Sequence, residues 1–395
     1  MKDYILVFGG GTLQCSIINR IKLAGYSSVV IDPDPNAPGK ELADVFIPVG
    51  GQDYDATLEV AKKYGVTGIV TAATDKPILM MCRIAKELGL PFPSYESCDT
   101  VLDKARFKEF LKENNLPHAK GQMFTGDADV TALDFNFPVI TKPVVNSGSR
   151  GVIKAHNLEE LALAVKETLL HSRDRKYLIE EYIEGDEISV EALVQHGKVH
   201  VLQLTDKIVT PPPYNVELGH IQPSRFMDLK PEIEALLQKI VDRSGLDHCA
   251  LHPELKIING RITLIEIGPR LGGDFITSDL VPLSTGINME DQLLKIATGR
   301  DTELARKEAA AMVSFFNLPA GKTVGEGGLD DMHAVSGLHK YSFSLKVGEK
   351  VPAITNSLDR YGEAIFHADT REGLLEIVKE AQTNIEQKLV TVDGN

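Results

Sequence analysis

Apolar and polar positions alternate along the first ninety residues in a way that predicts strands and helices in turn. Short apolar runs that end in glycines or acids, such as YILVFGG and SSVVIDPDP, are typical of buried strands, and ADVFIPV and GVTGIVTAATD continue them. LQCSIINRIKLAG and PILMMCRIAKELG instead space their apolar residues along one helical face and end at a glycine. This order predicts a parallel sheet covered by helices, an α/β arrangement.

The pattern changes at LPFPSYES, where two prolines indicate a domain boundary near Pro93. A charged helix, DKARFKEFLKENNLP, follows it. From about Thr125 the pattern predicts strands and turns around one amphipathic helix, LEELALAVKETLLHS. From about Asp301 it predicts short strands before a last helix, REGLLEIVKEAQTNIEQKL. We therefore expect an α+β organisation after the first domain.

Composition narrows the class of protein. The chain has 395 residues, too many for one core, and its 43% hydrophobic and 25% charged content is typical of a soluble globular protein. No apolar run approaches the roughly 18–20 residues of a membrane span, and the start MKDY does not resemble a signal peptide, so we expect a cytoplasmic protein. The net charge of −14 argues against a nucleic-acid partner. The four cysteines form no CxxC pair and predict free thiols, not a zinc site.

The glycine turn after the first strand allows three interpretations. Gly9 and Gly11 fit a dinucleotide fingerprint, but Gln14 stands where its third glycine would be. Asp32 ends the second strand, where a ribose-binding acid would lie. The turn could also simply connect a strand to a helix, or line a pocket for a second small substrate, which is the interpretation we favour.

Two lysines and a glycine-rich loop could hold phosphates. Lys142 ends the apolar strand FPVIT, where we expect it to be exposed and to point into a cleft or solvent. The loop at residues 146–151, NSGSRG, could bring backbone N–H groups close to phosphate oxygens, or could be a plain hairpin loop. Lys104, at the head of the charged helix, would alone be read as a solvated surface residue.

The segment YLIEEYIEGDEISVEAL carries more acids than a core strand tolerates. They are Glu180, Glu181, Glu184, Asp186 and Glu187. A solvated turn explains them. So does a hinge between two lobes, in which backbone groups around Tyr182 and Ile183 meet an adenine edge and a carboxylate binds ribose hydroxyls.

Glu254 and Glu266 lie on two strands joined by a turn at Asn259-Gly260, a hairpin signature. A two-residue loop would set Glu254 opposite Ile265. A three-residue loop through Arg261 would set Glu254 opposite Glu266, and we favour this register because it explains both acids.

Two carboxylates that face each other require a cation between them, and Mg²⁺ prefers oxygen ligands. Arg270 follows at the strand end in LIEIGPRLGG, where it could grip a transferring phosphoryl group, and the two glycines would leave room for a substrate. Alternatively, the acids lie on a solvated face and Arg270 is their salt-bridge partner.

Together these segments resemble the ATP-grasp superfamily over nearly the whole chain. The resemblance rests on ILVFGGG…VVIDPDPNAPGKELAD, the lysine pair, the glycine-rich loop, EEYIEGDE and E…IEIGPRLGG. Within the superfamily the chain is most similar to carbamoyl-phosphate-synthase-like carboxylate–amine ligases, including bacterial L-amino-acid ligases. VELGHIQPSRF and VGEKVPAITNSLDRYGEAIFHADT also look like that subgroup.

The resemblance implies three domains and a reaction. The domains are a Rossmann-like domain (1–95), a two-lobed ATP-grasp domain (96–300) with a lid at about 122–183 and a metal-binding lobe at about 184–300, and a small β-rich α+β module (301–395). In the reaction a carboxylate attacks the γ-phosphate of ATP, and an amine then displaces phosphate from the acyl phosphate. The partners are therefore small carboxylates and amines, the cofactors ATP and Mg²⁺, for which Mn²⁺ can substitute, and a homodimer is the commonest assembly.

The resemblance also implies roles for individual residues. Lys104 and Lys142 would bind phosphates, with Lys142 also near the adenine, and the lid loop would comprise Ser147, Gly148, Ser149 and Gly151. Adenine would contact Glu180, Tyr182 and Ile183, ribose would bind Glu187, and magnesium would bind Glu254 and Glu266. Arg270 would steady the phosphoryl group and the acyl phosphate, and Gly272 and Gly273 would shape the acyl-phosphate pocket.

Substrate specificity is expected in loops around Asp75, Lys207, Glu217 and His220. We place His220 on a loop with Glu217 and Arg225, which could gather a substrate's amino and carboxylate groups, although a surface histidine is equally compatible with the sequence.

One position departs from the family pattern. The usual Glu-x-Asn-x-Arg has Gly268 at its centre here, so a second metal ion would lack one ligand. His252 is interpreted as a structural neighbour of the metal acids. A bicarbonate-using carboxylase of purine-pathway type and an ATP-binding protein without turnover remain alternatives, and an NAD oxidoreductase ranks last.

Overall fold

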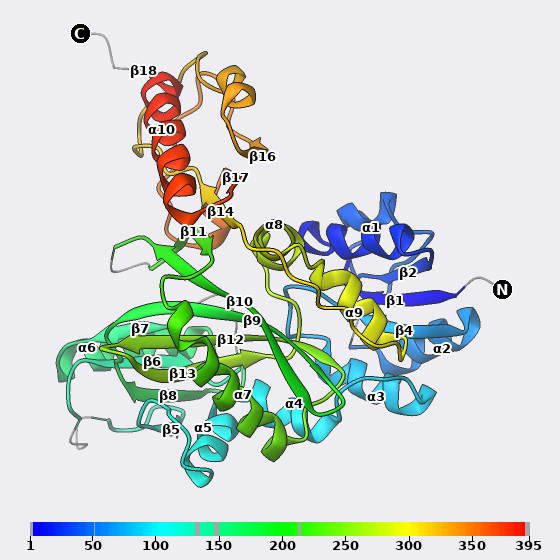
Figure 1. The fold of residues 1–395 in the computed structure, drawn as a ribbon. Helices are drawn as coiled ribbons and strands as arrows, with labels where there is room; N and C mark the ends of the chain where they lie inside the picture. The colour runs from blue at the N-terminus through cyan, green and yellow to red at the C-terminus, as the bar shows by residue number, and fades with distance from the viewer. Residues whose placement is uncertain (1–2, 51, 131–134, 146–149, 212–214, 392–395) are drawn as a thin grey trace. The chain divides into compact units, whose positions relative to one another are not determined.

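The computed structural model describes residues 3–50, 52–130, 135–145, 150–211 and 215–391 (Figure 1). Its contacts divide the chain into two compact units. The first unit comprises Met1–Leu202, Asp228–Gly273 and Met289–Glu303, and the second comprises Gln203–Met227, Asp274–Asn288 and Leu304–Asn395. Each unit is thus assembled from segments far apart in sequence. The division into three domains, which differs from these two units, stays a prediction.

The N-terminal part of the first unit is the predicted parallel sheet. Its strand order is β3-β2-β1-β4, with β1 at Tyr4–Phe8, β2 at Ser27–Ile31, β3 at Val45–Ile47 and β4 at Val66–Val70. The accompanying helices are α1 (Cys15–Leu23), α2 (Tyr54–Tyr64) and α3 (Ile78–Leu88). β1 and β2 are buried along almost their whole length, which explains their continuous apolar runs.

Side chains of the protein form hydrogen bonds around the glycine turn that follows β1. Asp32 Oδ2 accepts a 2.7 Å hydrogen bond from the backbone N–H of Gly10, and Asp32 Oδ1 accepts one of 2.8 Å from Asp34 N–H. The carboxamide of Gln14 packs against Gly9 and donates to the carbonyl of Ala72 at 2.6 Å. These contacts favour the plain connecting turn over the dinucleotide interpretation, because Asp32 already accepts hydrogen bonds from two backbone N–H groups, whereas the pocket for a second small substrate stays a prediction.

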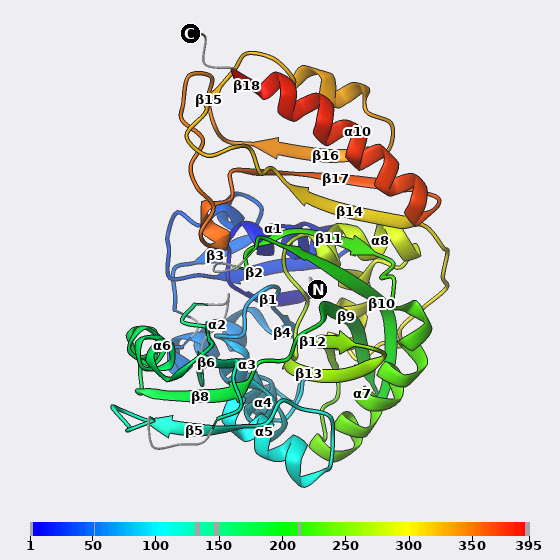
Figure 2. The same ribbon diagram turned by 90° about the vertical axis from the view of Figure 1, so that its left-hand side faces the viewer.

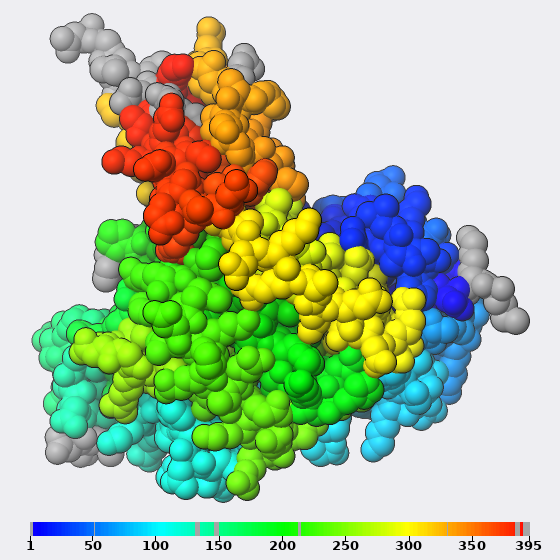
Figure 3. Space-filling view, in the orientation of Figure 1, coloured from blue at the N-terminus to red at the C-terminus, as the bar shows by residue number. Residues whose placement is uncertain are grey.

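A segment from late in the chain completes this part of the first unit. Helix α9 (Met289–Ala297) packs against α1 and β4, and the yellow segment lies beside the blue one in the space-filling view (Figure 3). Arg20 Nε on α1 lies 2.6 Å from Asp291 Oδ1, and Ser16 donates to Glu290 at 2.8 Å.

The first unit also contains two antiparallel groups of strands. One has the order β5-β8-β6-β7 and is covered by α6 (Figure 1). The bounds are β5 Gly121–Thr125, β6 Val139–Pro143, β7 Ile153–Ala155, α6 Leu158–Leu170 and β8 Lys176–Glu181. The other has the order β13-β12-β9, with β9 Asp186–Gln195, β12 Cys249–Ile258 and β13 Arg261–Gly268, and the remaining helices of the unit are α4 Tyr95–Leu102, α5 Lys104–Glu113 and α7 Lys230–Ser244.

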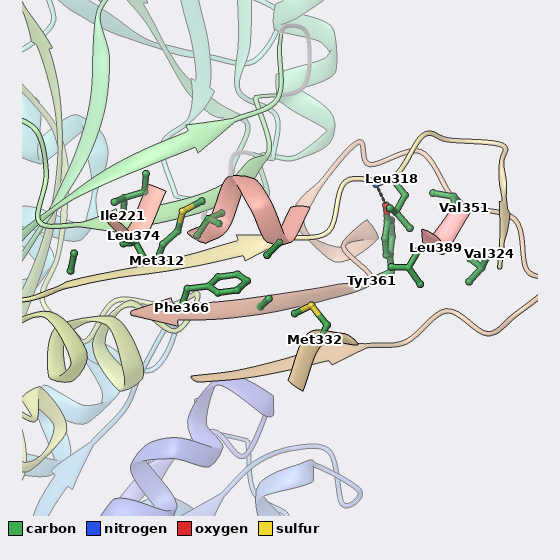
Figure 4. Packing of buried hydrophobic residues seen from close by; sticks show 14 residues of the cluster. Ile221, Met312, Leu318, Val324, Met332, Val351, Tyr361, Phe366, Leu374 and Leu389 are labelled. Atoms are coloured by element: carbon green, nitrogen blue, oxygen red, sulfur yellow. Dashed lines mark hydrogen bonds between the residues drawn. The ribbon is translucent and has the colours of Figure 1, made fainter. Parts of the chain in front are cut away.

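The second unit is built around a further antiparallel group, β11-β14-β17-β16, with α10 lying across it (Figure 2). The bounds are β11 Glu217–Gln222, α8 Val281–Thr285, β14 Ala310–Phe315, β15 Thr323–Val324, β16 Leu338–Phe343, β17 Gly362–Ala368, α10 Arg371–Leu389 and β18 Val390–Thr391; β10, Lys198–Val209, begins in the first unit and ends in the second. Its core contains Met312, Phe366 and Leu374, and Tyr361 Oη accepts a hydrogen bond from Leu318 N–H at 2.6 Å (Figure 4).

The mixed α/β and α+β architecture predicted from the sequence is confirmed. The four cysteines are free thiols, as expected. Among the described residues, no helix combines the length and apolar character that crossing a membrane demands.

Asp103 begins the helix that carries Lys104. Its carboxylate accepts hydrogen bonds from the backbone N–H groups of Ala105 at 2.9 Å and Arg106 at 3.0 Å. We predict that Asp103→Ala destabilises the first unit by about 1 kcal/mol, the usual cost of losing a helix N-cap. Urea unfolding and hydrogen exchange of the α5 amides measure this. Glu109→Ala, an exposed site on the same helix, is the control, and an unchanged unfolding midpoint in Asp103→Ala would contradict the prediction.

Candidate active site

The two glutamates of the β12–β13 hairpin face each other. Ile258 pairs with Arg261, so the loop has two residues, and the register then shifts so that Glu254 pairs with Glu266. The predicted pairing of the acids is confirmed, but the predicted three-residue loop is wrong. A β-bulge that leaves Ile265 unpaired produces the pairing instead.

Lys104 neutralises part of this acid pair. Its Nζ lies 2.9 Å from Glu266 Oε2, and both glutamates are partly exposed. Burial opposes the charge of Lys104, but attraction to Glu266, Asp75 and Glu254 outweighs that cost and raises the pKa of Lys104. Lys104 is thus a half-buried, paired cation, not the solvated surface residue that its position alone would suggest.

Arg270 is fixed against the turn that follows β4. Its Nε lies 2.9 Å from Asp75 Oδ1, and Ala73 N–H donates to the carbonyl of Leu271 at 3.1 Å. Burial opposes the guanidinium charge, yet Asp75, together with the two hairpin acids, raises the pKa of Arg270. A Cβ atom on Gly268 would lie 3.0 Å from Arg270 Cζ, so the arginine side chain occupies the space beside that glycine.

A buried histidine–glutamate pair lies behind the hairpin acids. His252 Nδ1 is 3.0 Å from Glu191 Oε2, His252 Nε2 is 3.8 Å from Glu254 Oε1, and Glu191 is 0% exposed. Burial disfavours the Glu191 carboxylate, but His252 and Ser189 keep its pKa below the ordinary value. His252 is therefore a neighbour of the acids, as predicted. A Cβ on Gly272 would lie 2.7 Å from His252 Nδ1, so Gly272 makes room for this pair.

A second polar cluster joins α5 to the antiparallel strands. Glu180 is only 4% exposed, and its two oxygens lie 2.6 Å from Lys108 Nζ and 2.6 Å from Lys142 Nζ. Burial disfavours the charged carboxylate, but Lys142 and Lys108 hold the pKa of Glu180 below its usual value, while burial lowers the pKa of Lys108. The expectation that Lys142 is exposed is wrong, as is the solvated-turn interpretation for Glu180.

The first unit has a cavity beside this cluster. It is small and partly open to solvent. Its lining includes the charged residues Lys104, Lys108, Lys142 and Glu180 and the apolar residues Phe107 and Leu111. Lys104 belongs to this lining and also pairs with Glu266, so the two charged clusters meet at one residue.

The remaining predicted nucleotide residues are only partly gathered here. Tyr182 N–H donates to the carbonyl of Pro138 at 3.0 Å, so it is already satisfied, and the Tyr182 ring lies 3.8 Å from Lys154 Nζ. Ile183 is the second residue after the end of β8, and Glu187 pairs with Lys256 at 3.1 Å. Gly151 packs against His171 with φ +73°, whereas Ser147, Gly148 and Ser149 lie outside the described residues.

In the second unit, His220 lies within β11, so its predicted loop position is wrong. It is 2% exposed, its Nε2 is 3.4 Å from Asp274 Oδ2, and its Nδ1 has no hydrogen-bond partner within the described parts of the chain. Arg360 binds Asp274 with both terminal nitrogens, at 2.7 and 2.8 Å. Burial alone would raise the pKa of Asp274, but His220 and Arg360 lower it well below its usual value.

The other predicted residues of this unit lie around the same cluster. Lys207 pairs with His220 across β10 and β11, and Glu217 Oε2 accepts a hydrogen bond from Ser357 at 3.4 Å. Arg225 instead stacks over Phe226, 5.0 Å from the ring centre.

Sequence reasoning missed four charged residues of these clusters: Lys108, Glu191, Asp274 and Arg360. Lys108 offered one signal, because it lies four residues after Lys104 and hence on the same helical face. The partners of the other three are distant in sequence.

Within the described ranges, no three His, Cys, Asp or Glu side chains are arranged as a metal site. Glu254 and Glu266 form a pair, and a metal ion bound between them would take its further ligands from groups other than the described His, Cys, Asp and Glu side chains.

Comparison with known proteins identifies the family of the central region. The model for the ATP-grasp domain matches residues 135–279. The carbamoyl phosphate synthase large chain of Thermoanaerobacter sp. (strain X514) is 24% identical over 321 residues, which cover 75% of this chain and 29% of that protein. The chain therefore spans about three tenths of the length of this curated relative.

Solved structures resemble the chain along its whole length. L-amino acid ligase from Bacillus licheniformis superposes with a TM-score of 0.84 at 19% identity, covering 100% of this chain and 99% of that one. The biotin carboxylase domain of 2-oxoglutarate carboxylase from Hydrogenobacter thermophilus, solved with MgADP and bicarbonate, gives 0.75 at 21% identity, covering 99% and 92%. Sequence and fold agree that this chain contains an ATP-grasp domain.

Proposed function

We propose that the protein is an ATP-dependent carboxylate–amine ligase that forms ADP and phosphate through an acyl phosphate. The observation that carries the proposal is the pairing of two charged clusters in the first unit. The cavity cluster sets two buried ammonium groups against Glu180, while the hairpin cluster concentrates acids beside Lys104 and Arg270. The first favours an anion and the second a cation, which is what a metal–nucleotide complex supplies.

The nucleotide would bind beside this small cavity, along the polar cluster of Lys104, Lys142 and Glu180. In this proposal Glu180, Tyr182 and Ile183 meet adenine, with Ile183 and the carbonyl groups supplying the backbone contacts because Tyr182 N–H is already bonded to Pro138. Phosphates would bind Lys142 and Lys104. Ribose would be bound by Glu187, and the lid loop would comprise Ser147, Gly148, Ser149 and Gly151.

Glu254 and Glu266 fit a magnesium ion because they are two oxygen donors placed directly opposite each other. When bound, the ion would neutralise charge on the phosphate oxygens. Arg270, held by Asp75, would then steady the transferring phosphoryl group from a fixed direction. The carboxylate substrate attacks the γ-phosphorus and ADP leaves; the amine next attacks the acyl carbon and phosphate leaves, so ATP, carboxylate and amine become amide, ADP and phosphate.

We further propose an amino-acid-like substrate, on the similarity in fold to L-amino acid ligase. In the first unit the candidate substrate residues are Asp75, Gly272 and Gly273. In the second unit they are Lys207, Glu217 and His220.

A bicarbonate-using carboxylase is the second candidate. It is favoured by the fold similarity to a biotin carboxylase domain solved with bicarbonate.

Phosphorus NMR of the nucleotide products tests the function directly. The protein would receive Mg-ATP with pooled amino acids in one arm and with bicarbonate in the other. We predict ADP and phosphate only with amino acids. Turnover confined to bicarbonate would favour the carboxylase, and AMP with pyrophosphate would contradict acyl-phosphate chemistry. Mg-ATP binding without turnover in either arm would favour a binding protein.

Removal of one hairpin acid tests the metal assignment. We predict that Glu266→Gln lowers ADP formation by at least about 100-fold, because the amide removes one of two facing charges needed to balance the cation. Glu59→Gln, an exposed change on α2, serves as the control. Mn²⁺ affinity measured by electron paramagnetic resonance should fall in parallel. Unaltered Mn²⁺ binding in Glu266→Gln would exclude this carboxylate as a ligand.

Arg270→Lys tests the phosphoryl-gripping role. Lysine keeps the charge but loses the planar fork held by Asp75, so we predict a drop in kcat of about 100-fold with ATP affinity changed less than about threefold. Arg261→Lys, on the exposed start of β13, is the matched control. An equal loss in ATP affinity and kcat would indicate ground-state binding instead.

A further inference from the structure

We propose that Lys108 is a positioning residue of the nucleotide site, which keeps Glu180 paired and in place when Lys142 turns from Glu180 to a phosphate. The inference rests on the proposed function, because it needs a phosphate that Lys142 binds. It assigns a role to a residue that the family resemblance does not include.

Glu180 is shared between the two lysines in a way that lets one leave. Lys108 Nζ contacts Oε1 and Lys142 Nζ contacts Oε2, each at 2.6 Å. Because the two ammonium groups use different oxygens, departure of Lys142 does not disturb the contact between Lys108 and Glu180.

The two lysines differ in what else holds them. Lys108 Nζ also donates to the carbonyl of Ala119, so its ammonium group is fixed from a second direction. Across the described parts of the chain, Glu180 is the partner the structure gives for Lys142 Nζ. Lys142 stands on β6, whereas Lys108 stands on α5. Lys142 is therefore the more readily released of the two.

Charge balance gives Lys108 its function. One carboxylate balances one ammonium group, and a buried carboxylate without any partner is strongly disfavoured. Glu180 is 4% exposed, so Lys142 can move to an anionic ligand at small cost only if Lys108 remains beside Glu180. Without Lys108, Glu180 would compete with the phosphate for Lys142.

A purely structural role for Lys108, bracing α5 against the chain at Ala119, makes a different prediction. In that case its loss would weaken the protein regardless of the charge at residue 180. If it acts through Glu180, its loss would matter only while that residue is charged.

Titration of the full chain with Mg-ATP by calorimetry separates these cases. We predict that Lys108→Met weakens ATP binding by about 10- to 100-fold, a part of the cost of leaving a buried carboxylate unpaired. Lys112→Met, one turn further along the same helix and exposed, should stay within about twofold of the wild type. In a Glu180→Gln background, Lys108→Met should weaken binding by less than about threefold, because the amide does not compete for Lys142.

Each outcome decides the proposal. Wild-type affinity in Lys108→Met overturns it and leaves the proposed function intact, and equal losses in the charged and amide backgrounds overturn it in favour of a structural role. A wild-type protein that binds no nucleotide overturns the proposed function together with the inference. If Lys108→Met does not fold, Lys108→Gln, which keeps an N–H donor for Ala119, replaces it with the same expected pattern.

Discussion

The unpaired residue in β13 is the constraint on which the polar cluster of the hairpin depends. Side chains alternate between the two faces of a strand, so a shift of one residue reverses which face each one occupies. With a two-residue turn and a regular ladder, Glu254 would face Ile265 and Glu266 would point to the other side. The bulge at Ile265 instead brings both carboxylates to one face. Facing like charges are unfavourable unless cations neutralise them, and Lys104 and Arg270 are the cations the chain supplies.

The cavity also depends on charge neutralisation, but here two cations surround one buried carboxylate. Glu180 is buried because two ammonium groups replace the water it loses, and they keep it charged despite its burial. Lys104 lines this cavity and also contacts Glu266. The positively charged cavity cluster and the negatively charged hairpin cluster of the first unit thus share Lys104. An elongated ligand with an anionic part and a bound cation matches this arrangement better than a neutral ligand would.

The sequence predicted what local periodicity determines and failed where distant residues decide. β1, β2, α1 and α3 follow from apolar spacing, which needs no tertiary information. The bulge was not predictable, because a register shift reflects packing of the whole sheet. The position of Lys142 at the end of an apolar strand predicts exposure, and nothing local indicates its partner Glu180, which is 38 residues further along the chain. The sequence analysis places His220 on a loop, yet it lies in β11, which is paired with β10 on one side and β14 on the other.

Gly268 shows why a departure from a family pattern has to be judged in its surroundings. Resemblance to ATP-grasp enzymes predicts an asparagine there, and its absence would remove one oxygen ligand. In this chain the Arg270 guanidinium lies against Gly268, at a distance that leaves little room for any side chain. A side chain there would require the guanidinium, which Asp75 holds, to shift by a few tenths of an ångström. On our proposal, the chain therefore lacks a ligand side chain at residue 268 while it keeps the arginine of the family pattern at residue 270. Mg²⁺ commonly takes one or two carboxylates and completes its shell with phosphate oxygens and water, so two facing glutamates are sufficient for it.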